Sequence, residues 1–562
     1  MGSDDREAPR AVGLSTAGTG VGSAPPVADA VDSDRIRVAR STEPHNWLTY
    51  YGAYDGWRYS ELDQIHTGNV AGLLPAWVFQ FGSQAVHVGA STHAFENAPV
   101  VVDGVMFVTG WDGYVWALDA RTGRQLWQYK HAIPYDVSLC CGNVNRGCAV
   151  ARGKVFVATL NAHLVALDAT TGTVVWDRTN GDVRAGESAT VAPLVVKDLV
   201  LVGSSGGEFG VRGHLDAYDL ATGEHRWRCY TVPRPGEPGA ETWPEGGEEW
   251  ARGGGNTWVT GTFDPETDLV YWGTGNPAPD FDGEVRPGDN LHTDSVIAVD
   301  ADTGEIRWHY QFTPHDLWDY DSNMEMILFS DGGRKLLAHF DKNGYFFVLD
   351  RVDGSLVRVT PFADRIDWGS IAADGTVTPS IFPDKEGEDV HFWPGPAGAK
   401  EWTHAAYSPR THMFYVPVQD VGSTVTRRRV SAEGVAYWDA EVSVDADDMA
   451  GQVKAFDAST GEETWRWDHH LPMSASVLAT AGDVVFCGSP SGDFHAFDAF
   501  TGEVLWMFDT GSGHHSSPST YAVDGRQYIA VPVGWGSWVE GFAPGMMGGP
   551  HGDALFVFAL PP

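Results

Sequence analysis

A short phrase recurs along the chain and limits what it can fold into. In each copy an aspartate is followed by a turn containing Thr-Gly, and a tryptophan stands eight positions after the aspartate. A degenerate copy begins at Asp350 and has Arg358 in the tryptophan position, while Trp77 lacks an aspartate turn of its own. The complete copies are Asp119 with Trp127, Asp168 with Trp176, Asp219 with Trp227, Asp300 with Trp308, Asp457 with Trp465, and Asp498 with Trp506.

The repeat predicts an all-β fold, an eight-bladed β-propeller with tryptophan-docking motifs. Asp and Gly favour a tight turn between two strands, because Gly reaches positive φ and Asp bonds its own backbone. A tryptophan at a fixed place after each turn can wedge against the next unit, at the spacing of propeller blades. We expect a late strand, Asp553 to Leu560, to complete the unit begun near Leu73 to Phe81, which closes the ring without a long exposed edge. A β-solenoid or several sandwiches would not explain the tryptophan spacing.

Composition divides the chain and narrows its partners. Residues 1–42 are rich in Ala, Gly, Ser, Asp and Pro and are predicted to be a disordered tail, without the pattern of a secretory signal peptide. Residues 43–562 are predicted to be the propeller. The chain has 37 Lys and Arg against 75 Asp and Glu, a net charge of −38, which argues against nucleic acid or an anionic membrane surface as a partner but permits a basic protein. No apolar run is long enough to span a membrane.

The tryptophan spacing is stretched in two places, Trp227 to Trp308 and Arg358 to Trp465. Insertions of this kind lie on one face of a repeat protein, often the binding face. Just after the first of them, Thr313 to Asp321 packs three carboxylates and a histidine into nine residues. Asp319 and Asp321 stand two apart, so on an extended segment they would point the same way and could share a cation or a proton. In so acidic a chain, such a pair is also typical of a solvated loop.

Three motifs precede this stretch in the chain, and a fourth lies within it. Adjacent cysteines can close only a strained ring or stay as two buried free thiols. In this order on a tryptophan-docked propeller, the motifs closely resemble those of the quinoprotein alcohol dehydrogenases, the methanol and ethanol dehydrogenase family that uses pyrroloquinoline quinone (PQQ). The resemblance runs from about Trp47 to the C-terminus. The motifs are Cys140-Cys141-Gly142-Asn143-Val144-Asn145-Arg146-Gly147, Gly206 to Gly213 (Gly-Gly-Glu-Phe-Gly-Val-Arg-Gly), Gly275 to Pro279 (Gly-Asn-Pro-Ala-Pro), and Pro314 to Asp319 (Pro-His-Asp-Leu-Trp-Asp).

The resemblance implies a site for the cofactor. Cys140 and Cys141 would form a vicinal disulfide over the quinone, with the Trp258 indole beneath it. Arg146 would pair with a PQQ carboxylate, and Lys342 would hydrogen-bond a quinone oxygen or the catalytic carboxylate. The full set that the resemblance implies is Glu96, Cys140, Cys141, Arg146, Thr190, Ser205, Gly206, Gly207, Asn256, Trp258, Lys342 and Trp538, with Trp535 as the alternative to the last.

The resemblance also implies a metal ion and a reaction. Glu208, Asn276 and Asp319 correspond to metal ligands, which offer the hard oxygen shell that calcium-like ions prefer. Asp319 would be the catalytic base, taking the hydroxyl proton while hydride passes from the alcohol carbon to the quinone. Asp321 resembles the extra carboxylate ligand of lanthanide-dependent members, although some sugar-oxidising relatives also carry an acid there. We therefore expect PQQ- and metal-dependent oxidation of an alcohol to an aldehyde or ketone, with a lanthanide(III) or Ca²⁺ ion.

The sequence gives weaker indications of the electron acceptor, the cellular location and the alcohol substrate. The chain has no Cys-x-x-Cys-His haem motif, so we expect an external electron acceptor such as a basic cytochrome c. The family and the vicinal disulfide indicate a periplasmic or secreted protein. Asp280 to Gly283 and Asp364 to Ala455 depart from the family pattern, so methanol specificity is not implied. Arg427-Arg428-Arg429 is predicted to be a solvated loop. The competing hypothesis is a non-enzymatic propeller scaffold of the kind used in outer-membrane assembly, because a fold alone does not establish a function.

Overall fold

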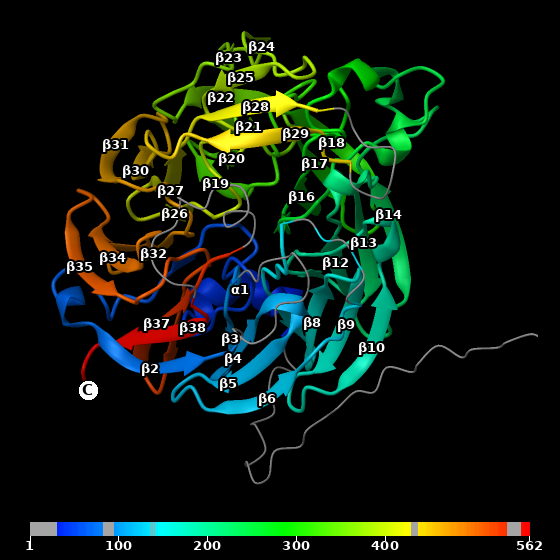
Figure 1. Ribbon diagram of the computed structural model, residues 1–562. Helices are drawn as coiled ribbons and strands as arrows, with labels where there is room; N and C mark the ends of the chain where they lie inside the picture. The colour runs from blue at the N-terminus through cyan, green and yellow to red at the C-terminus, as the bar shows by residue number, and fades with distance from the viewer. Residues whose placement is uncertain are drawn as a thin grey trace, which may run out of the picture.

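The computed structural model describes residues 31–82, 95–134, 137, 139, 141–428, 437–536 and 552–562. Almost all of its regular structure is β-strand, and Figure 1 shows the sheets side by side around a ring, so the fold is an all-β propeller. Within the described residues, seven sheets have four strands and one has five. Successive strands in these sheets are antiparallel neighbours, apart from the short parallel strand β1 (Tyr59–Ser60) that joins the edge of β32.

The bounds of these strands follow the sequence repeat. The eight larger sheets are β3 to β6 (Val100–Val102, Val105–Thr109, Val115–Asp119, Gln125–Tyr129), β7 to β10 (Cys148–Ala151, Lys154–Thr159, His163–Asp168, Val174–Thr179), β11 to β14 (Leu194–Val196, Leu199–Gly203, His214–Asp219, His225–Tyr230), β15 to β18 (Thr262–Asp264, Leu269–Gly273, Ser295–Asp300, Ile306–Gln311), β19 to β22 (Ile327–Asp331, Arg334–Phe340, Tyr345–Asp350, Leu356–Pro361), β26, β27, β30 and β31 (Ala406–Ser408, Met413–Asp420, Ala450–Asp457, Glu463–His469), β32 to β35 with β1 (Leu478–Thr480, Val484–Gly488, Asp493–Asp498, Val504–Asp509), and β36 to β38 with β2 (Ser519–Val523, Arg526–Val533, Ala554–Ala559, Leu74–Gln80).

The repeated tryptophans join neighbouring sheets. Trp465, at the end of one phrase, lies against the turn glycine Gly502 of the next, and its Nε1 donates to the carbonyl of Ala499 at 3.0 Å. A Cβ added to Gly502 would stand 2.5 Å from the indole, so only glycine allows the ring to approach this closely. The same glycine and tryptophan contact recurs at Gly123 with Trp77, Gly172 with Trp127, Gly223 with Trp176, Gly304 with Trp227, and Gly354 with Trp308.

The degenerate copy keeps this junction by other means. Arg358 takes the tryptophan position, and its guanidinium donates to the carbonyl of Ala458 at 3.0 Å and to that of Ser459. The arginine also lies close to Gly461, the turn glycine of the next phrase. A long cationic side chain therefore reproduces the indole's hydrogen bond, although without its flat apolar face.

The ring closes through strands that are far apart in the chain, as predicted. β2 pairs antiparallel with β38, with Val78 opposite Phe556 and Phe79 opposite Leu555. In Figure 1 the blue strand β2 lies directly beside the red strand β38. Each strand gains a hydrogen-bonded neighbour, so this sheet has no unpaired edge at the junction.

The segment before the first sheet differs from the prediction. Residues 1–30 lie outside the described residues, but Ser33–Thr42 form helix α1, which the sequence had placed in a disordered tail. Asp32 caps the helix by accepting from the backbone N–H of Arg35 at 2.9 Å. Ile36 and Ala39 are buried in the core between sheets, so this helix is part of the fold. No helix in the described part of the chain is long and apolar enough to cross a membrane.

The second insertion forms two small sheets of its own. They contain β23 and β24 (Gly369–Ile371, Val377–Pro379) and β25, β28 and β29 (Asp389–Phe392, Ser423–Arg427, Ala440–Val444). They pack on the stretch Thr313 to Asp321 through a shared apolar cluster that includes Trp318, Tyr320 and Trp368. The indole of Trp318 also donates to the carbonyl of Ile381 at 2.9 Å. The insertion therefore buries one side of the acidic stretch.

Candidate cofactor and metal site

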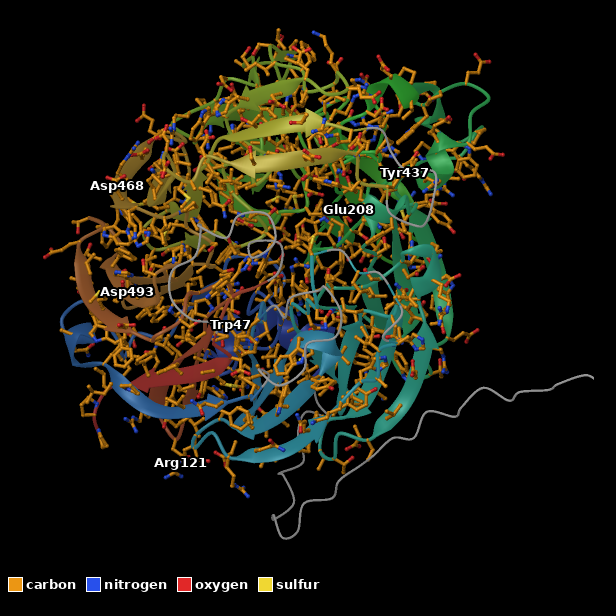
Figure 2. The ribbon with its side chains drawn as sticks, in the orientation of Figure 1. Trp47, Arg121, Glu208, Tyr437, Asp468 and Asp493 are labelled. Atoms are coloured by element: carbon orange, nitrogen blue, oxygen red, sulfur yellow. The ribbon has the colours of Figure 1, made fainter. Side chains whose placement is uncertain are left out.

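The candidate residues lie on loops that leave equivalent strands of successive sheets. Glu208 follows β12, Asn276 follows β16, and Lys342 follows β20, each the second strand of its sheet in the chain. Because the sheets repeat around a ring, these loops emerge on the same face. In Figure 2, Glu208 lies to the right of the ring's centre, whereas Asp468 and Asp493 lie at its left rim.

The acidic stretch is shaped by its own first carboxylate. The buried side chain of Asp316 accepts from the backbone N–H groups of Trp318, at 3.0 Å, and Tyr320, at 2.9 Å. These bonds fix a turn in which Asp319 has a φ of 64°. His315 bonds the carbonyl of Gly288 at 2.7 Å through Nδ1. Asp316 and His315 therefore build the turn, whereas Asp319 is presented by it.

One buried arginine ties this turn to the neighbouring loop. Arg286 donates to the carbonyls of Pro279 and Asp280, each at 2.8 Å, and to that of Asp316 at 2.5 Å. Its remaining nitrogen bonds the side chain of Asn290 at 3.0 Å. The arginine thus fixes the loop that carries Asn276 against the turn that carries Asp319.

Asp321 is the most heavily bonded carboxylate of the site. Its Oδ1 accepts from the indole Nε1 of Trp258 at 3.1 Å and from the backbone N–H of Asn276 at 3.2 Å. Its Oδ2 accepts from Nζ of Lys342 at 3.0 Å. A Cβ at Gly275 would come within 2.4 Å of Oδ1, so a glycine is needed for the loop to approach this carboxylate. Asp321 therefore links the predicted metal ligands to the predicted cofactor-binding indole.

Lys342 is the central positive charge. Its Nζ lies 3.0 Å from Asp321, 3.4 Å from Glu401 and 3.9 Å from Asp319, and its side chain is only 3 % exposed. Burial opposes its charge, but the three carboxylates together hold the pKa of Lys342 well above its usual range. Its contacts with three carboxylates therefore favour the charged form of the lysine.

Several carboxylates near Lys342 have too few positive charges around them to offset their burial. Burial raises the pKa of Glu208 to about 7, and the charge of Asp321 adds to this. Burial also raises the pKa of Asp319 well above its usual range; Lys342 opposes the rise, while Asp321 and Glu208 strengthen it. Asp280 accepts a hydrogen bond from the side chain of Asn276 at 2.6 Å. Burial, and then the charge of Asp319, raise the pKa of Asp280 well above its usual range. A cation bound among these oxygens would relieve the repulsion.

A second buried group surrounds Arg146. Its guanidinium pairs with Glu96 at 3.0 Å and donates to the hydroxyl of Thr190 at 2.7 Å. Thr190 in turn bonds the hydroxyl of Ser205 at 2.9 Å. The guanidinium also lies over the ring of Trp258, 4.7 Å from its centroid. Four of the predicted cofactor residues and the predicted stacking indole thus form one connected cluster.

The glycine-rich loop at Gly206 and Gly207 brings its backbone, rather than side chains, close to the site. Gly206 has a φ of 120°, and a Cβ there would stand 2.2 Å from the carbonyl of Gly186. Gly207 faces the side-chain oxygens of Asn256 and Asn276. Asn256 donates from Nδ2 to the hydroxyl of Ser204 at 3.1 Å. This geometry holds the glycines and Asn256 at the same edge of the site as Glu208.

Two predicted cofactor residues, Cys140 and Trp538, lie outside the described residues. Cys141 is disulfide-bonded, whereas Cys148, Cys229 and Cys487 are buried free thiols. Trp535, the alternative to Trp538, is buried.

The prediction for the arginine run was wrong at its first residue. Arg427 is buried and pairs with Asp282 at 2.6 Å, whereas Arg428 is exposed and pairs with Glu441 at 2.8 Å. Arg429 lies outside the described residues. The difference arises because β28 places Arg427 against the loop that follows Asn276, and the half-buried Asp282 there supplies a counter-charge.

Sequence reasoning missed several residues of the site. Glu401 contacts Lys342, and the neighbouring indole of Trp402 lies under the guanidinium of Arg146, 4.9 Å from the ring centroid. Tyr437 donates its backbone N–H to the carbonyl of Glu208 at 2.5 Å, and Figure 2 shows the two residues on the same side of the ring. The sequence carried no repeat or motif around these residues that would have marked them.

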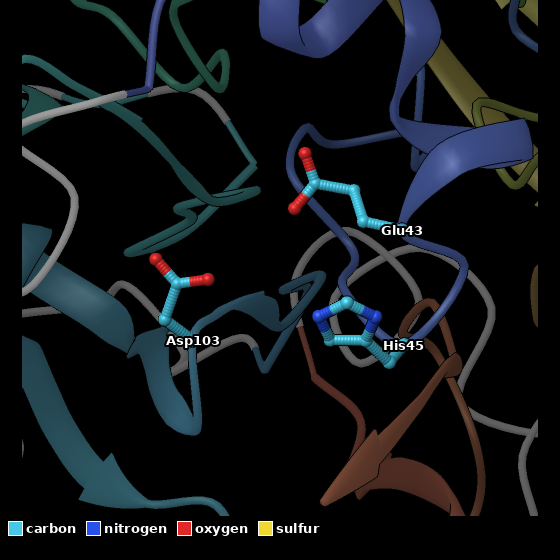
Figure 3. A group of neighbouring side chains, drawn as sticks. All are labelled: Glu43, His45 and Asp103. Atoms are coloured by element: carbon cyan, nitrogen blue, oxygen red, sulfur yellow. The ribbon is translucent and has the colours of Figure 1, made fainter.

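A separate acidic group lies at the surface. The side chains of Glu43, His45 and Asp103 face one another (Figure 3) and are close enough to hold a cation. Arg35 already bonds both carboxylates, at 2.7 Å to each, and Asn46 bonds them too. Arg35 therefore already compensates part of the negative charge of this group, and its contacts fasten α1 to the first sheet.

The site fits both a metal ion and a flat acidic cofactor. Glu208, Asn276, Asp319 and Asp321 offer carboxylate and amide oxygens, the ligands that calcium-like ions prefer. Among the described residues, Oδ1 of Asn256, Nε1 of Trp402 and Nε of Arg146 are buried without a hydrogen-bond partner. Buried polar atoms in that condition are costly, and the oxygens of a bound cofactor would satisfy the donors among them.

Comparison with known proteins gives a consistent result. The family profile described as "Glucose/ethanol/alcohol dehydrogenase, beta-propeller domain" matches residues 47–365. A second profile, "Outer membrane protein assembly factor BamB", matches only residues 449–532.

Individual relatives match over most of their length. The chain is 39 % identical to "Quinoprotein alcohol dehydrogenase PedH" of Pseudomonas putida, over 95 % of this chain and 94 % of that protein. It is 38 % identical to "Lanthanide-dependent methanol dehydrogenase" of Methylacidiphilum fumariolicum, over 88 % and 86 %. The crystal structure of quinohemoprotein alcohol dehydrogenase from Comamonas testosteroni superposes with a TM-score of 0.87 at 36 % identity, and the match covers 95 % of this chain and 83 % of that one.

Proposed function

The chain belongs to the quinoprotein alcohol dehydrogenase family, and from this premise we propose which of its residues carry out the reaction. The protein is an oxidoreductase that uses PQQ to oxidise an alcohol. The observation that supports the residue assignment is the cluster of Glu208, Asn276, Asp319 and Asp321 near the buried Lys342. It combines hard oxygen ligands with a shortage of positive charge.

Asp319 is the proposed catalytic base. When bound, PQQ supplies a carbonyl that accepts hydride, and the metal ion supplies Lewis acidity. Asp319 is held by its turn with 18 % of its side chain exposed, while Asp321 is engaged by three donors. Asp319 can therefore accept the alcohol proton. Asp321 instead fixes its three donors in place and contributes negative charge to the site. Lys342, 3.9 Å away, favours the ionised form of Asp319 and so opposes the rise in its pKa that burial causes. A bound metal cation would favour the ionised base further.

The cofactor residues would hold and orient the quinone. Arg146 offers a guanidinium for a PQQ carboxylate, and Glu96 and Thr190 fix its position. Trp258 offers one flat face of the pocket, because its indole is anchored to Asp321. The proposed partners on the other face are Cys140 and Cys141, as a vicinal disulfide. The remaining proposed contacts are Ser205, Gly206, Gly207, Asn256, Lys342 and Trp538.

We propose a lanthanide(III) ion, with Ca²⁺ as the alternative. Glu208, Asp319 and Asp321 would contribute three negative charges and Asn276 a neutral oxygen, which suits a trivalent ion. The lanthanide-dependent methanol dehydrogenase among the relatives supports this choice. Reconstitution of the metal-free protein with PQQ and either La³⁺ or Ca²⁺ tests it. Activity restored by Ca²⁺ alone would contradict the lanthanide assignment.

The role of Asp319 is tested by Asp319→Asn. This variant keeps the side-chain shape but cannot accept the proton, so alcohol oxidation coupled to an artificial dye should fall by about 10²–10⁴-fold in PQQ- and metal-loaded protein. Glu224→Gln, at the exposed turn between β13 and β14, removes the same charge and should leave the rate unchanged. Normal turnover by Asp319→Asn with PQQ and metal bound would refute the assignment.

We propose that the eight sheets of four or five strands are the eight blades of a single propeller domain. The net charge of −38 would attract a basic cytochrome c as the electron acceptor, with an oxidation rate that falls as salt is added. A periplasmic or secreted location fits the proposed vicinal disulfide. Rates independent of ionic strength would argue against electrostatic attraction of the acceptor.

A further inference from the structure

Lys342 already occupies the place of a cation among the proposed metal ligands. It contacts Asp321 at 3.0 Å and Asp319 at 3.9 Å, and its side chain is 3 % exposed. A metal ion bound to these two carboxylates would therefore take the groups that neutralise the lysine. Two cations that share the same carboxylates repel each other strongly, because a protein site screens their charges much less than water does. Because it is buried, Lys342 cannot move its charge into water.

A third carboxylate offers the lysine another partner. Oε1 of Glu401 lies 3.4 Å from Nζ of Lys342, and Glu401 is not one of the proposed metal ligands. Its Oε2 accepts from the backbone N–H of Trp402 at 2.8 Å, which fixes the carboxylate in place. The nearby Lys400 does not need it, because its own Nζ is paired with Glu325 at 2.7 Å. Glu401 is thus a rigid carboxylate whose inward oxygen faces Lys342.

We propose that Glu401 is a positioning residue that holds the charge of Lys342 when a metal ion occupies Asp319 and Asp321. The lysine changes its main partner without leaving its buried position, because it contacts both sets of carboxylates already. Glu401 thereby permits a lysine and a multivalent cation to share one site. The inference rests on the proposed metal site and adds a residue that acts on the metal through Lys342.

The test is a double-mutant cycle on metal affinity. La³⁺ is titrated by calorimetry into the full chain loaded with PQQ, for the wild type, Glu401→Gln, Lys342→Gln and the double variant. Glu401→Gln should weaken La³⁺ binding about tenfold or more, because Lys342 is left without its alternative partner. In the Lys342→Gln background the same change should weaken binding by less than about threefold. Glu224→Gln controls for the loss of one negative charge and should bind La³⁺ normally.

Two further comparisons keep the test decisive. Glu401→Asp retains the charge beside Lys342 and should recover most of the affinity lost in Glu401→Gln. If the Gln variant folds poorly, the Asp variant still tests whether the negative charge is needed. Unchanged affinity in Glu401→Gln, or an equal loss with and without Lys342, would overturn the inference while leaving the metal site intact. A wild type that binds neither La³⁺ nor Ca²⁺ would overturn the metal site and the inference together.

Discussion

The junctions between sheets predict how three glycine substitutions should differ. Gly502→Ala places a methyl group 2.5 Å from Cε3 of Trp465, on a backbone with φ of +73°. The left-handed backbone alone costs about 1–2 kcal/mol for a residue other than glycine. Overpacking against the indole should add about 1–3 kcal/mol, because the buried Trp465 must shift and weaken its bond to Ala499.

The chain supplies matched controls. Gly525 has a φ of +76° and nothing within 4 Å of an added Cβ, so Gly525→Ala carries the backbone cost without the clash. Gly461 has a φ of +75° and faces the flexible Arg358 at 2.8 Å. Since a guanidinium can move aside more easily than a packed indole, Gly461→Ala should resemble Gly525→Ala.

The assay is guanidinium chloride unfolding of the full chain followed by tryptophan fluorescence. The midpoint should fall most for Gly502→Ala, and by smaller, similar amounts for Gly461→Ala and Gly525→Ala. Comparing midpoints with the slopes of the transitions guards against a change in unfolding mechanism. Equal midpoints for all three variants would refute the reasoning that tryptophan docking, rather than glycine conformation alone, requires these residues.

Further predictions concern the site and its insertion. Burial raises the pKa of Glu208 to about 7, so protons should compete with the metal, and calorimetric metal affinity should fall as the pH is lowered through 7; a pH-independent affinity would argue against Glu208 as a ligand. Arg427→Met should destabilise the protein by about 1–3 kcal/mol, because the half-buried carboxylate of Asp282 loses its partner. Arg428→Met, at an exposed pair, should cost less than about 1 kcal/mol, and similar unfolding midpoints for the two variants would contradict the difference in burial. Trp258→Phe should weaken PQQ binding measured by fluorescence, since the ring loses its anchor on Asp321; unchanged affinity would remove Trp258 from the cofactor site.

Much of the fold could be predicted because the repeated residues are themselves the ones that make the contacts between sheets. An aspartate turn and a tryptophan at fixed spacing specify both a strand pair and the neighbour on which it docks. The pairing of β2 with β38 followed from the orphan Trp77, which needed a sheet. Helix α1 escaped prediction because its sequence is short and polar, and only contact with the core buries Ile36 and Ala39.

The site was predictable where a motif names the residue and unpredictable where the fold creates the contact. Asn276 and Asp319 stand in motifs, Asp321 lies two residues beyond one, and the structure brings all three together. Glu401 and Arg427 come from the second insertion, where no repeat fixes which side chains turn inward. Three consecutive arginines look alike in sequence, and only the position of Asp282 decides that the first is buried.

The pairing of β2 with β38 also bears on how the molecule folds. Val78 and Phe556 meet only after the whole ring of intervening sheets has been brought into a curve. Closing so long a loop carries a large entropic cost, and contacts between distant residues slow folding. The individual sheets can form locally and early, so the closing sheet should assemble last. Until then, two strand edges remain open to pairing with another chain, and this interval is when the protein is most prone to aggregate.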